Sequence, residues 1–268
     1  MRPLLLLHGA LLPLTAATAH HPTAWVPLVN IPTAPRQEHT TVFLPPDNIV
    51  ILGGITNRTD STTSLVQSYS IRRNTWTTLA PLPRALNHPN AAVVEGKIYV
   101  LGGLAQTAES WEATGESWVY DTPRGRWKSV AALPETEARG SAVVGVFDGK
   151  VVLAGGLKQI QLVSPFAQDT VDTVSMYDVR KDKWVDVPSS ASKLPDTRDH
   201  ACAAVIDGKF YVFGGRERGQ LSGKKSVPVL DLKAQDKGWM VGKETMPTPR
   251  AGLACGVIEQ RIHIWWRR

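Results

Sequence analysis

The segment from Arg198 to Gly215 reads RDHACAAVIDGKFYVFGG, and versions of it recur along the chain. An apolar run, the pair Asp207-Gly208, and a second run rich in aromatic and β-branched residues predict a hairpin of two strands. Each copy ends in a Gly-Gly doublet, and the first glycines of the doublets are Gly53, Gly102, Gly155 and Gly214. The doublets recur about every 50 residues, which is a period typical of propeller blades.

Four tryptophans follow the same period and mark a second hairpin in each repeat. They are Trp76, Trp127, Trp184 and Trp239. In three repeats a tyrosine precedes the tryptophan, as Tyr69, Tyr120 and Tyr177. Turn-forming and charged residues separate the two aromatic residues, so the chain is expected to reverse direction between them. Each repeat therefore predicts four antiparallel strands.

With these features the sequence resembles the kelch-repeat family, in which one repeat forms one four-stranded blade. A further shared feature is an arginine ahead of the first strand, as in Arg36, Arg139, Arg198 and Arg250. The resemblance implies an all-β fold, a kelch-type β-propeller. The expected repeats span residues 33–83, 84–134, 135–195 and 196–249, followed by a partial fifth repeat at 250–268. Because Trp265-Trp266 stands where the fifth doublet belongs, we expect a ring that is truncated or incompletely closed.

Residues 1–19 predict a signal peptide. Arg2 is followed by leucine-rich runs and by the small-residue site Ala17-Thr18-Ala19, the pattern of a cleavable secretory leader. No later segment is long and apolar enough to predict a membrane span. We therefore expect a secreted, extracellular protein whose residues 20–268 form one domain.

The segment AWVPLVNIP at residues 24–32 matches TWTTLAPLP at residues 75–83, where a fourth strand is expected. Propellers often close by letting a terminal strand complete the blade begun at the other end. We predict that residues 24–31 pair with the blade that begins at Arg250, which would remove two unpaired sheet edges.

Cys202 and Cys255 are predicted to be buried apolar residues, with a disulfide as the alternative. Counted from Arg198 and Arg250, the cysteines stand at offsets of four and five residues. This difference puts them on opposite faces of equivalent strands. A disulfide requires a short distance between its two residues, so the difference in facing argues against a bond.

The formal net charge of +6 does not predict a nucleic-acid partner, because the basic residues are scattered and form no run interleaved with aromatic residues. The variable segments after the doublets predict a binding surface instead. They are residues 55–64, 104–117, 157–170 and 216–226. Such loops lie together on one face of a propeller, and polar loops on a rigid scaffold commonly bind partners.

We therefore expect a monomeric binding protein that recognises a protein or carbohydrate partner through these loops. Trp111 and Phe166 lie within two of the loops and are candidate contacts, because an aromatic ring can stack on a sugar or anchor a partner. Local packing is the alternative for both residues. Asn57-Arg58-Thr59 is the sequon expected to carry an N-linked glycan.

The repeated arginines Arg36, Arg139, Arg198 and Arg250 are candidate ligand-binding residues. Guanidinium groups bind carboxylates in a bidentate way, and in kelch domains that recognise acidic peptides the corresponding arginines do this. A structural salt bridge within each blade is the alternative. Leu86 occupies the place of the arginine in the second repeat, so the predicted ring is imperfect.

Three histidines stand in register, because His39, His88 and His200 each lie fourteen residues before the first glycine of their doublet. Ser141 takes this place in the third repeat. Equivalent positions on the innermost strands can face one axis, where imidazoles could bind a metal or transfer protons. The alternative is that each histidine makes a hydrogen bond within its own blade. We expect the latter, with no metal and no cofactor.

The alternative to a binding protein is a small-molecule enzyme of the kelch-like kind, for example an isomerase, a cyclase or an oxidase-like protein with a pocket on the axis. Copper radical oxidases such as galactose oxidase carry similar blades. No residue of this sequence can be matched to their copper site. The chain also has no GxSxG, HExxH, CxxC or phosphate-loop motif, so we assign no catalytic residue.

Overall fold

The computed structural model describes residues 26–32, 34–56, 61–163, 167–219 and 222–265. The predicted signal peptide, the sequon residue Asn57 and the loop residue Phe166 lie outside these ranges. The described secondary structure consists of β-strands and two short 3₁₀ segments, Glu135–Glu137 and Gln235–Lys237. None of the described helical segments has the length and apolar character needed to cross a membrane.

Successive strands pair antiparallel and form one blade per repeat. The first blade comprises β1 (Thr40–Leu44), β2 (Asn48–Leu52), β3 (Val66–Ser70) and β4 (Thr75–Thr78). The second comprises β5 (Ala91–Val94), β6 (Lys97–Gln106), β7 (Ser110–Asp121) and β8 (Arg126–Ser129). The third comprises β9 (Val143–Phe147), β10 (Lys150–Gln161), β11 (Gln168–Asp178) and β12 (Lys183–Val185). The fourth comprises β13 (Cys202–Ile206), β14 (Lys209–Phe213), β15 (Ser226–Asp231) and β16 (Trp239–Thr245). A last hairpin comprises β17 (Ala254–Ile258) and β18 (Arg261–Trp265).

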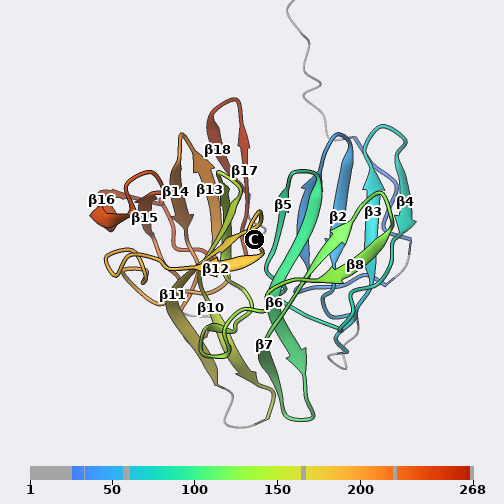
Figure 1. Cartoon of the computed structure of the whole chain (residues 1–268), viewed down its shortest axis with the longest axis horizontal. Coiled ribbons are helices and arrows are strands. Elements are labelled where there is room, and N and C mark those ends of the chain that lie inside the picture. The colour runs from blue at the N-terminus through green and yellow to red at the C-terminus, as the bar shows by residue number, and fades with distance from the viewer. Residues whose placement is uncertain (1–25, 33, 57–60, 164–166, 220–221, 266–268) are drawn as a thin grey trace, which may run out of the picture.

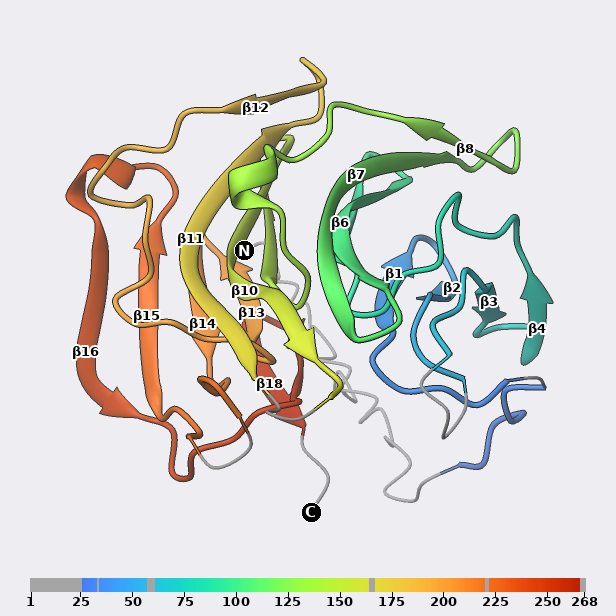
Figure 2. The same ribbon diagram turned by 90° about the horizontal axis from the view of Figure 1, so that it is seen from below.

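The blades follow one another around a common axis, with β4, β8, β12 and β16 on the outside of the ring (Figure 2). Among the described residues β17 and β18 pair only with each other, so the fifth sheet has two strands. The fold is therefore a kelch-type β-propeller of incomplete closure, which confirms the predicted fold class.

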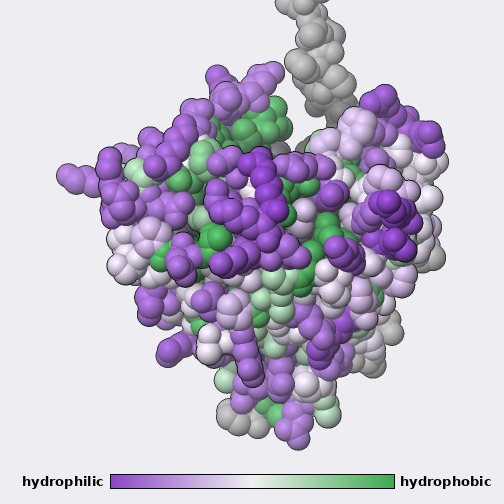
Figure 3. Space-filling model, in the orientation of Figure 1, coloured by the Kyte–Doolittle hydropathy of each residue, from purple (hydrophilic) through white to green (hydrophobic). Residues whose placement is uncertain are grey.

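The hydrophobic core lies between neighbouring blades, because side chains alternate between the two faces of each strand. In β6, Ile98 and Val100 pack on the first blade, and Tyr99 and Leu101 pack on the third. The partial fifth sheet covers its neighbour less fully. Val257 and Ile258 of β17 are about half exposed, and hydrophobic atoms gather over this hairpin in Figure 3.

The four repeated tryptophans connect each blade to the segment that precedes it in the ring. Each indole N–H donates to a backbone carbonyl oxygen, and the pairs are Trp76 to Val29 (3.0 Å), Trp127 to Ala80 (2.9 Å), Trp184 to Ala131 (3.0 Å) and Trp239 to Ala191 (3.1 Å). An indole N–H that leaves water usually finds such an acceptor, and the repetition of this contact accounts for the regular spacing of the four tryptophans.

Residues 26–32 occupy the place of a preceding blade's last segment, since Val29 binds Trp76 as Ala80 binds Trp127. The predicted pairing of residues 24–31 with β17–β18 is not found among the described residues. Residues 24 and 25 lie outside the described ranges.

The expectation that Cys202 and Cys255 are unbonded is wrong, because they form a disulfide with Cα atoms 5.8 Å apart. The two residues do lie on equivalent strands, β13 and β17, of neighbouring sheets. In a propeller the front face of one blade packs on the back face of the next. Because the two cysteines point to opposite faces of their equivalent strands, their side chains meet between the neighbouring sheets. They lie within an apolar cluster that also contains Phe213 and Ile264.

Candidate functional site

A cavity of about 630 Å³ lies on the propeller axis, where the innermost strands of all five sheets begin. Its lining comes from residues 38–41, 88, 89, 91, 141, 142, 144, 200–201 and 252–255. Each blade contributes the residues just before or at the start of its first strand, so the ring itself positions the cavity.

Five equivalent residues form the innermost turn of the ring: Glu38, His88, Ser141, His200 and Gly252. All five have a positive φ, between 49° and 65°. Backbone hydrogen bonds join them from blade to blade, from His88 N–H to Glu38 O (2.8 Å), from Ser141 N–H to His88 O (2.9 Å) and from Gly252 N–H to His200 O (2.8 Å). This arrangement places three ionisable side chains next to one another on the axis.

The structure places Glu38, rather than His39, in the set with His88 and His200. The connection between β1 and β2 has three residues, Pro45 to Asp47, whereas the corresponding turns of the other blades have two. The sequence pattern places the equivalent position fourteen residues before the first glycine of the doublet. In the first blade this count includes the extra turn residue, so it ends one residue too late, at His39. Counting forward from the repeated arginine gives Glu38. His39 lines the cavity, and its Nδ1 lies 3.1 Å from the carbonyl oxygen of Arg36.

Glu38, His88 and His200 converge on one point. The Oε2 atom of Glu38 lies 2.9 Å from Nε2 of His88 and 3.5 Å from Nε2 of His200. The two Nε2 atoms are 3.1 Å apart. We name these three residues the axial cluster; of their side chains, His88 and His200 are at most 10% exposed and Glu38 is 32% exposed.

The residue before each histidine fixes the orientation of the imidazole ring. Nδ1 of His88 lies 2.7 Å from Oδ1 of Asn87, and Nδ1 of His200 lies 2.5 Å from Oδ1 of Asp199. Asn87 and Asp199 are themselves fully buried. They are held by hydroxyl groups, because Asn87 donates to Thr62 (2.8 Å) and Asp199 accepts from Thr170 (2.7 Å).

Beneath the axial cluster, on the side of the loops that follow the doublets, the equivalent positions are Ile55, Leu104, Leu157 and Arg216. The first three form an apolar plug with Trp111 and Ile160. Arg216 replaces an apolar residue in the fourth blade. Its Nε donates to Asp199 (3.2 Å) and its Nη2 lies 3.1 Å from Nε2 of His200.

The axial groups have altered proton affinities. Burial opposes charge on Glu38, but hydrogen bonds with His200 and His88 outweigh it and hold the pKa of the carboxyl group well below its usual range. Burial lowers the pKa of His88. For His200 burial also disfavours the cation, yet hydrogen bonds with Asp199 and Glu38 outweigh burial and raise the pKa.

Ser141 does not form a nucleophilic relay with His200. Its Oγ lies 3.5 Å from Nδ1 of His200, the same nitrogen that faces Asp199. A serine–histidine–aspartate relay needs the serine and the carboxylate on different ring nitrogens. The arrangement therefore gives no support to hydrolysis by that route.

The predicted arginine ring does not face the cavity as a set. All five N–H donors of Arg139 bind inside its own blade, to the carbonyl oxygens of Glu137, Leu153, Thr173 and Gly155 and to Oγ of Ser175. Arg198 is likewise engaged by Asp196, Gly214 and Ser226. These contacts favour the structural alternative for both residues.

The remaining two arginines, Arg36 and Arg250, also donate hydrogen bonds to neighbouring protein groups. Arg36 donates to the side chain of Gln67 (2.5 Å) and to the carbonyl oxygen of Ile51 (3.3 Å). Arg250 donates to Oγ1 of Thr248 (2.7 Å). A ligand-binding role for either residue stays a prediction.

Trp111, a candidate surface contact, is buried in the apolar plug, with its ring centroid 6.0 Å from that of His88. The reason is that its segment is strand rather than loop. β7 begins at Ser110 and pairs with β10, with Trp111 opposite Ile160. Local packing, the alternative stated for this residue, is therefore what the structure shows.

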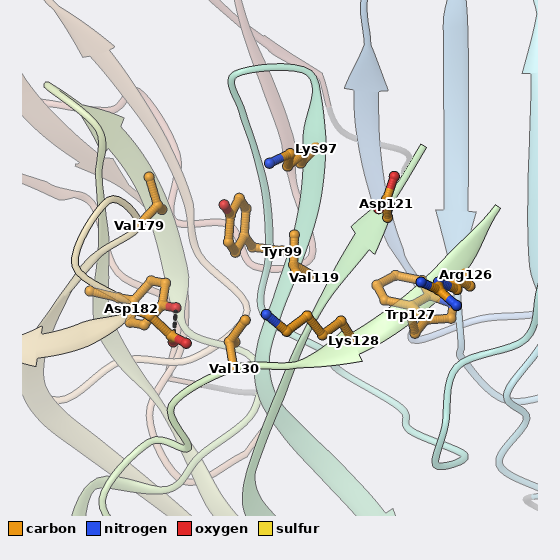
Figure 4. Close-up of a pocket in the computed structure, with 11 residues that line it drawn as sticks. Lys97, Tyr99, Val119, Asp121, Arg126, Trp127, Lys128, Val130, Val179 and Asp182 are labelled. Atoms are coloured by element: carbon orange, nitrogen blue, oxygen red, sulfur yellow. Dashed lines mark hydrogen bonds between the residues drawn. The ribbon is translucent and has the colours of Figure 1, made fainter. Parts of the chain in front are cut away.

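A second cavity, of about 460 Å³, lies between the second and third blades (Figure 4). Lys97, Tyr99 and Lys128 border it. Both of its carboxylates are already engaged. Asp121 pairs with Arg124 (2.8 Å), and Asp182 accepts hydrogen bonds from the hydroxyl of Tyr177 (2.6 Å) and the backbone N–H of Ala131 (2.7 Å). Because the contact with Ala131 joins the two blades and the carboxylates already have partners, the axial cavity is the stronger candidate site.

Comparison with known proteins agrees with this architecture. Kelch motifs match residues 85–134 and 138–190. Kelch-like protein terF of Aspergillus terreus is 39% identical over 249 residues, which is 90% of this chain and 52% of that protein. Kelch-like protein 35 of Mus musculus is 27% identical over 242 residues, 77% of this chain and 40% of that protein. Kelch repeat and BTB domain-containing protein 12 of Danio rerio is 26% identical over 206 residues, 73% of this chain and 32% of that protein.

The chain thus spans about half the length of the first of these relatives and less of the others. The motifs and the relatives support a kelch-repeat family.

Proposed function

We propose that the chain is a binding protein that recognises a protein partner on the propeller face formed by the segments after the glycine doublets. The observation that carries the proposal is a projection of two paired hairpins on this face. The hairpins β6–β7 and β10–β11 extend beyond the ring (Figure 1). They are joined because β7 pairs with β10, from Ser110 opposite Gln161 to Glu112 opposite Gln159.

The end of this projection has the character of a binding surface. A groove of about 400 Å³ lies between the two hairpins, lined by Glu109, Glu112, Gln159, Gln161 and Val163, among others. Glu109 and Glu112 are exposed, and Val163 is 50% exposed. Carboxylate and amide oxygens beside an apolar side chain suit a polypeptide segment that carries lysine or arginine next to an apolar residue. A carbohydrate partner remains the alternative proposal for the same surface.

The test is quantitative affinity purification from an extract of the source organism. The double variant Glu109→Lys/Glu112→Lys should recover the specific partner about tenfold less than the wild type, since a central interface residue commonly contributes more than 1 kcal/mol. Lys209→Glu, an exposed charge reversal at the opposite face, is the matched control and should recover it normally. Equal recovery by the double variant and the wild type would contradict the proposal.

We further propose that the protein is exported. Residues 1–19 have the pattern of a secretory leader, and disulfides such as Cys202–Cys255 persist mainly in oxidising compartments. Protein recovered from the culture medium should begin after Ala19 and show no free thiol at either cysteine by mass spectrometry. Recovery of the chain only inside the cell, with Met1 present and both thiols free, would rule out export.

A further inference from the structure

We propose that Glu38, His88 and His200 bind a divalent transition-metal ion, with zinc as the best fit, at the base of the axial cavity. The three residues come from three different blades, and the ring brings their ligand atoms within 4.8 Å of one another. Two imidazoles and one carboxylate are a common ligand set for zinc and for other first-row metals.

The spacing of the ligand atoms is close to the spacing around a bound zinc ion. A tetrahedral zinc with bonds of about 2.0 to 2.1 Å separates its ligand atoms by about 3.3 Å. The separations here are 2.9, 3.1 and 3.5 Å. Movements of a few tenths of an ångström would place all three atoms around one ion.

The outer contacts of the histidines orient their inner nitrogens toward the proposed ion. Nδ1 of His88 donates to Asn87 and Nδ1 of His200 donates to Asp199, so each ring, when neutral, presents the lone pair of Nε2. Nε2 of both rings faces the carboxylate of Glu38, and a proton on Nε2 supplies the hydrogen bonds with Glu38 in the metal-free protein. A metal ion would take the place of these protons, and buried side-chain acceptors behind metal-binding histidines are the usual outer layer of such sites.

The positively charged guanidinium of Arg216 lies next to the proposed metal ion and opposes its binding. Its contacts show how the metal ion and the guanidinium could both be accommodated. Its Nη2 lies 3.1 Å from Nε2 of His200, and this contact would be lost on metal binding. Its Nε would keep Asp199, so the guanidinium stays anchored. When both histidines are neutral, as metal ligands are, the charges of Glu38, Asp199 and Arg216 sum to −1 and partly balance the ion.

The site would have an open coordination position. Three protein ligands leave the fourth position of a tetrahedral zinc vacant for water or for an oxygen anion of a ligand. The apolar plug of Leu104, Trp111 and Leu157 lies on the loop side of the cluster, so the fourth position faces the axial cavity. This site is separate from the hairpin groove proposed for partner binding, and either proposal can fail without the other.

The test uses the chelator-treated, dialysed protein, titrated with Zn²⁺ by calorimetry and with Co²⁺ by visible absorption. The wild type should bind one ion per chain, and Co²⁺ should show the intense absorption of tetrahedral coordination. Glu38→Gln, His88→Gln and His200→Gln should each weaken Zn²⁺ binding by more than about 100-fold, beyond the range for loss of an outer contact. Glu38→Gln is the mildest change for folding because Glu38 is partly exposed.

Two further variants separate a metal site from a structural cluster. His39→Gln changes a histidine that lines the same cavity outside the axial cluster, and it should bind Zn²⁺ like the wild type. Asp199→Asn should weaken binding by about 10 to 100-fold. A folded wild type that binds neither metal at one ion per chain would overturn the proposal, as would a His39→Gln variant that loses Zn²⁺ as completely as Glu38→Gln.

Discussion

Replacing Arg139 with alanine is expected to lower the free energy of unfolding by about 3 to 5 kcal/mol. The side chain is fully buried, and its five donors satisfy four backbone carbonyl oxygens and one hydroxyl of the third blade. A buried acceptor that loses its partner costs about 1 to 3 kcal/mol, partly recovered where water enters the space. Burial lowers the pKa of Arg139 to about 10, so the group remains a cation at neutral pH.

The measurement is urea unfolding of Arg139→Ala beside Arg126→Ala, an exposed arginine on β8 of the neighbouring blade. The control should change stability by less than about 0.5 kcal/mol, as exposed substitutions usually do. Equal, small effects of the two substitutions would show that Arg139 is not a structural residue and would restore the idea of a ligand-binding arginine ring.

The second large effect is expected for Gly155→Ala, at the third doublet. Gly155 has φ +64°, and a Cβ atom there would lie 2.4 Å from the carbonyl oxygen of Arg198 in the next blade. The left-handed backbone costs a non-glycine residue about 1 to 2 kcal/mol, and forcing the blades apart adds about 1 to 3. We therefore expect a loss of about 2 to 5 kcal/mol in the free energy of unfolding.

Gly96→Ala separates the two contributions. Gly96 has φ +72°, and a Cβ atom there would meet nothing within 4 Å. It should show the backbone cost alone, about 1 to 2 kcal/mol. If Gly155→Ala and Gly96→Ala destabilise the protein equally, the close approach of neighbouring blades at the doublets is not what requires glycine there.

The glycine doublets show why the fold could be predicted from the sequence. Each doublet meets the backbone of the next blade, as Gly156 does when its N–H donates to the carbonyl oxygen of Arg198 (2.9 Å). Each tryptophan binds the segment before it, as Trp184 binds Ala131. A contact that is repeated around the ring requires the same residue in every repeat, so the repeat pattern of the sequence predicts the architecture.

The candidate site was harder to predict from the sequence, because it depends on structural features that occur only once in the chain. One additional residue in the turn Pro45 to Asp47 shifts the count, so that the sequence pattern pointed to His39 where the structure has Glu38. The burial of Trp111 depends on the pairing of β7 with β10 across two blades. Neither the length of a turn nor a contact between hairpins leaves a repeated signal along the chain.

The axial cluster is tested most directly by diffraction from zinc-loaded crystals of the wild-type protein at the zinc absorption edge. We predict one strong anomalous peak about 2.0 to 2.2 Å from Nε2 of His88, Nε2 of His200 and an oxygen of Glu38. A map without a peak among these three side chains, at a zinc concentration that produces peaks elsewhere on the molecule, would contradict it.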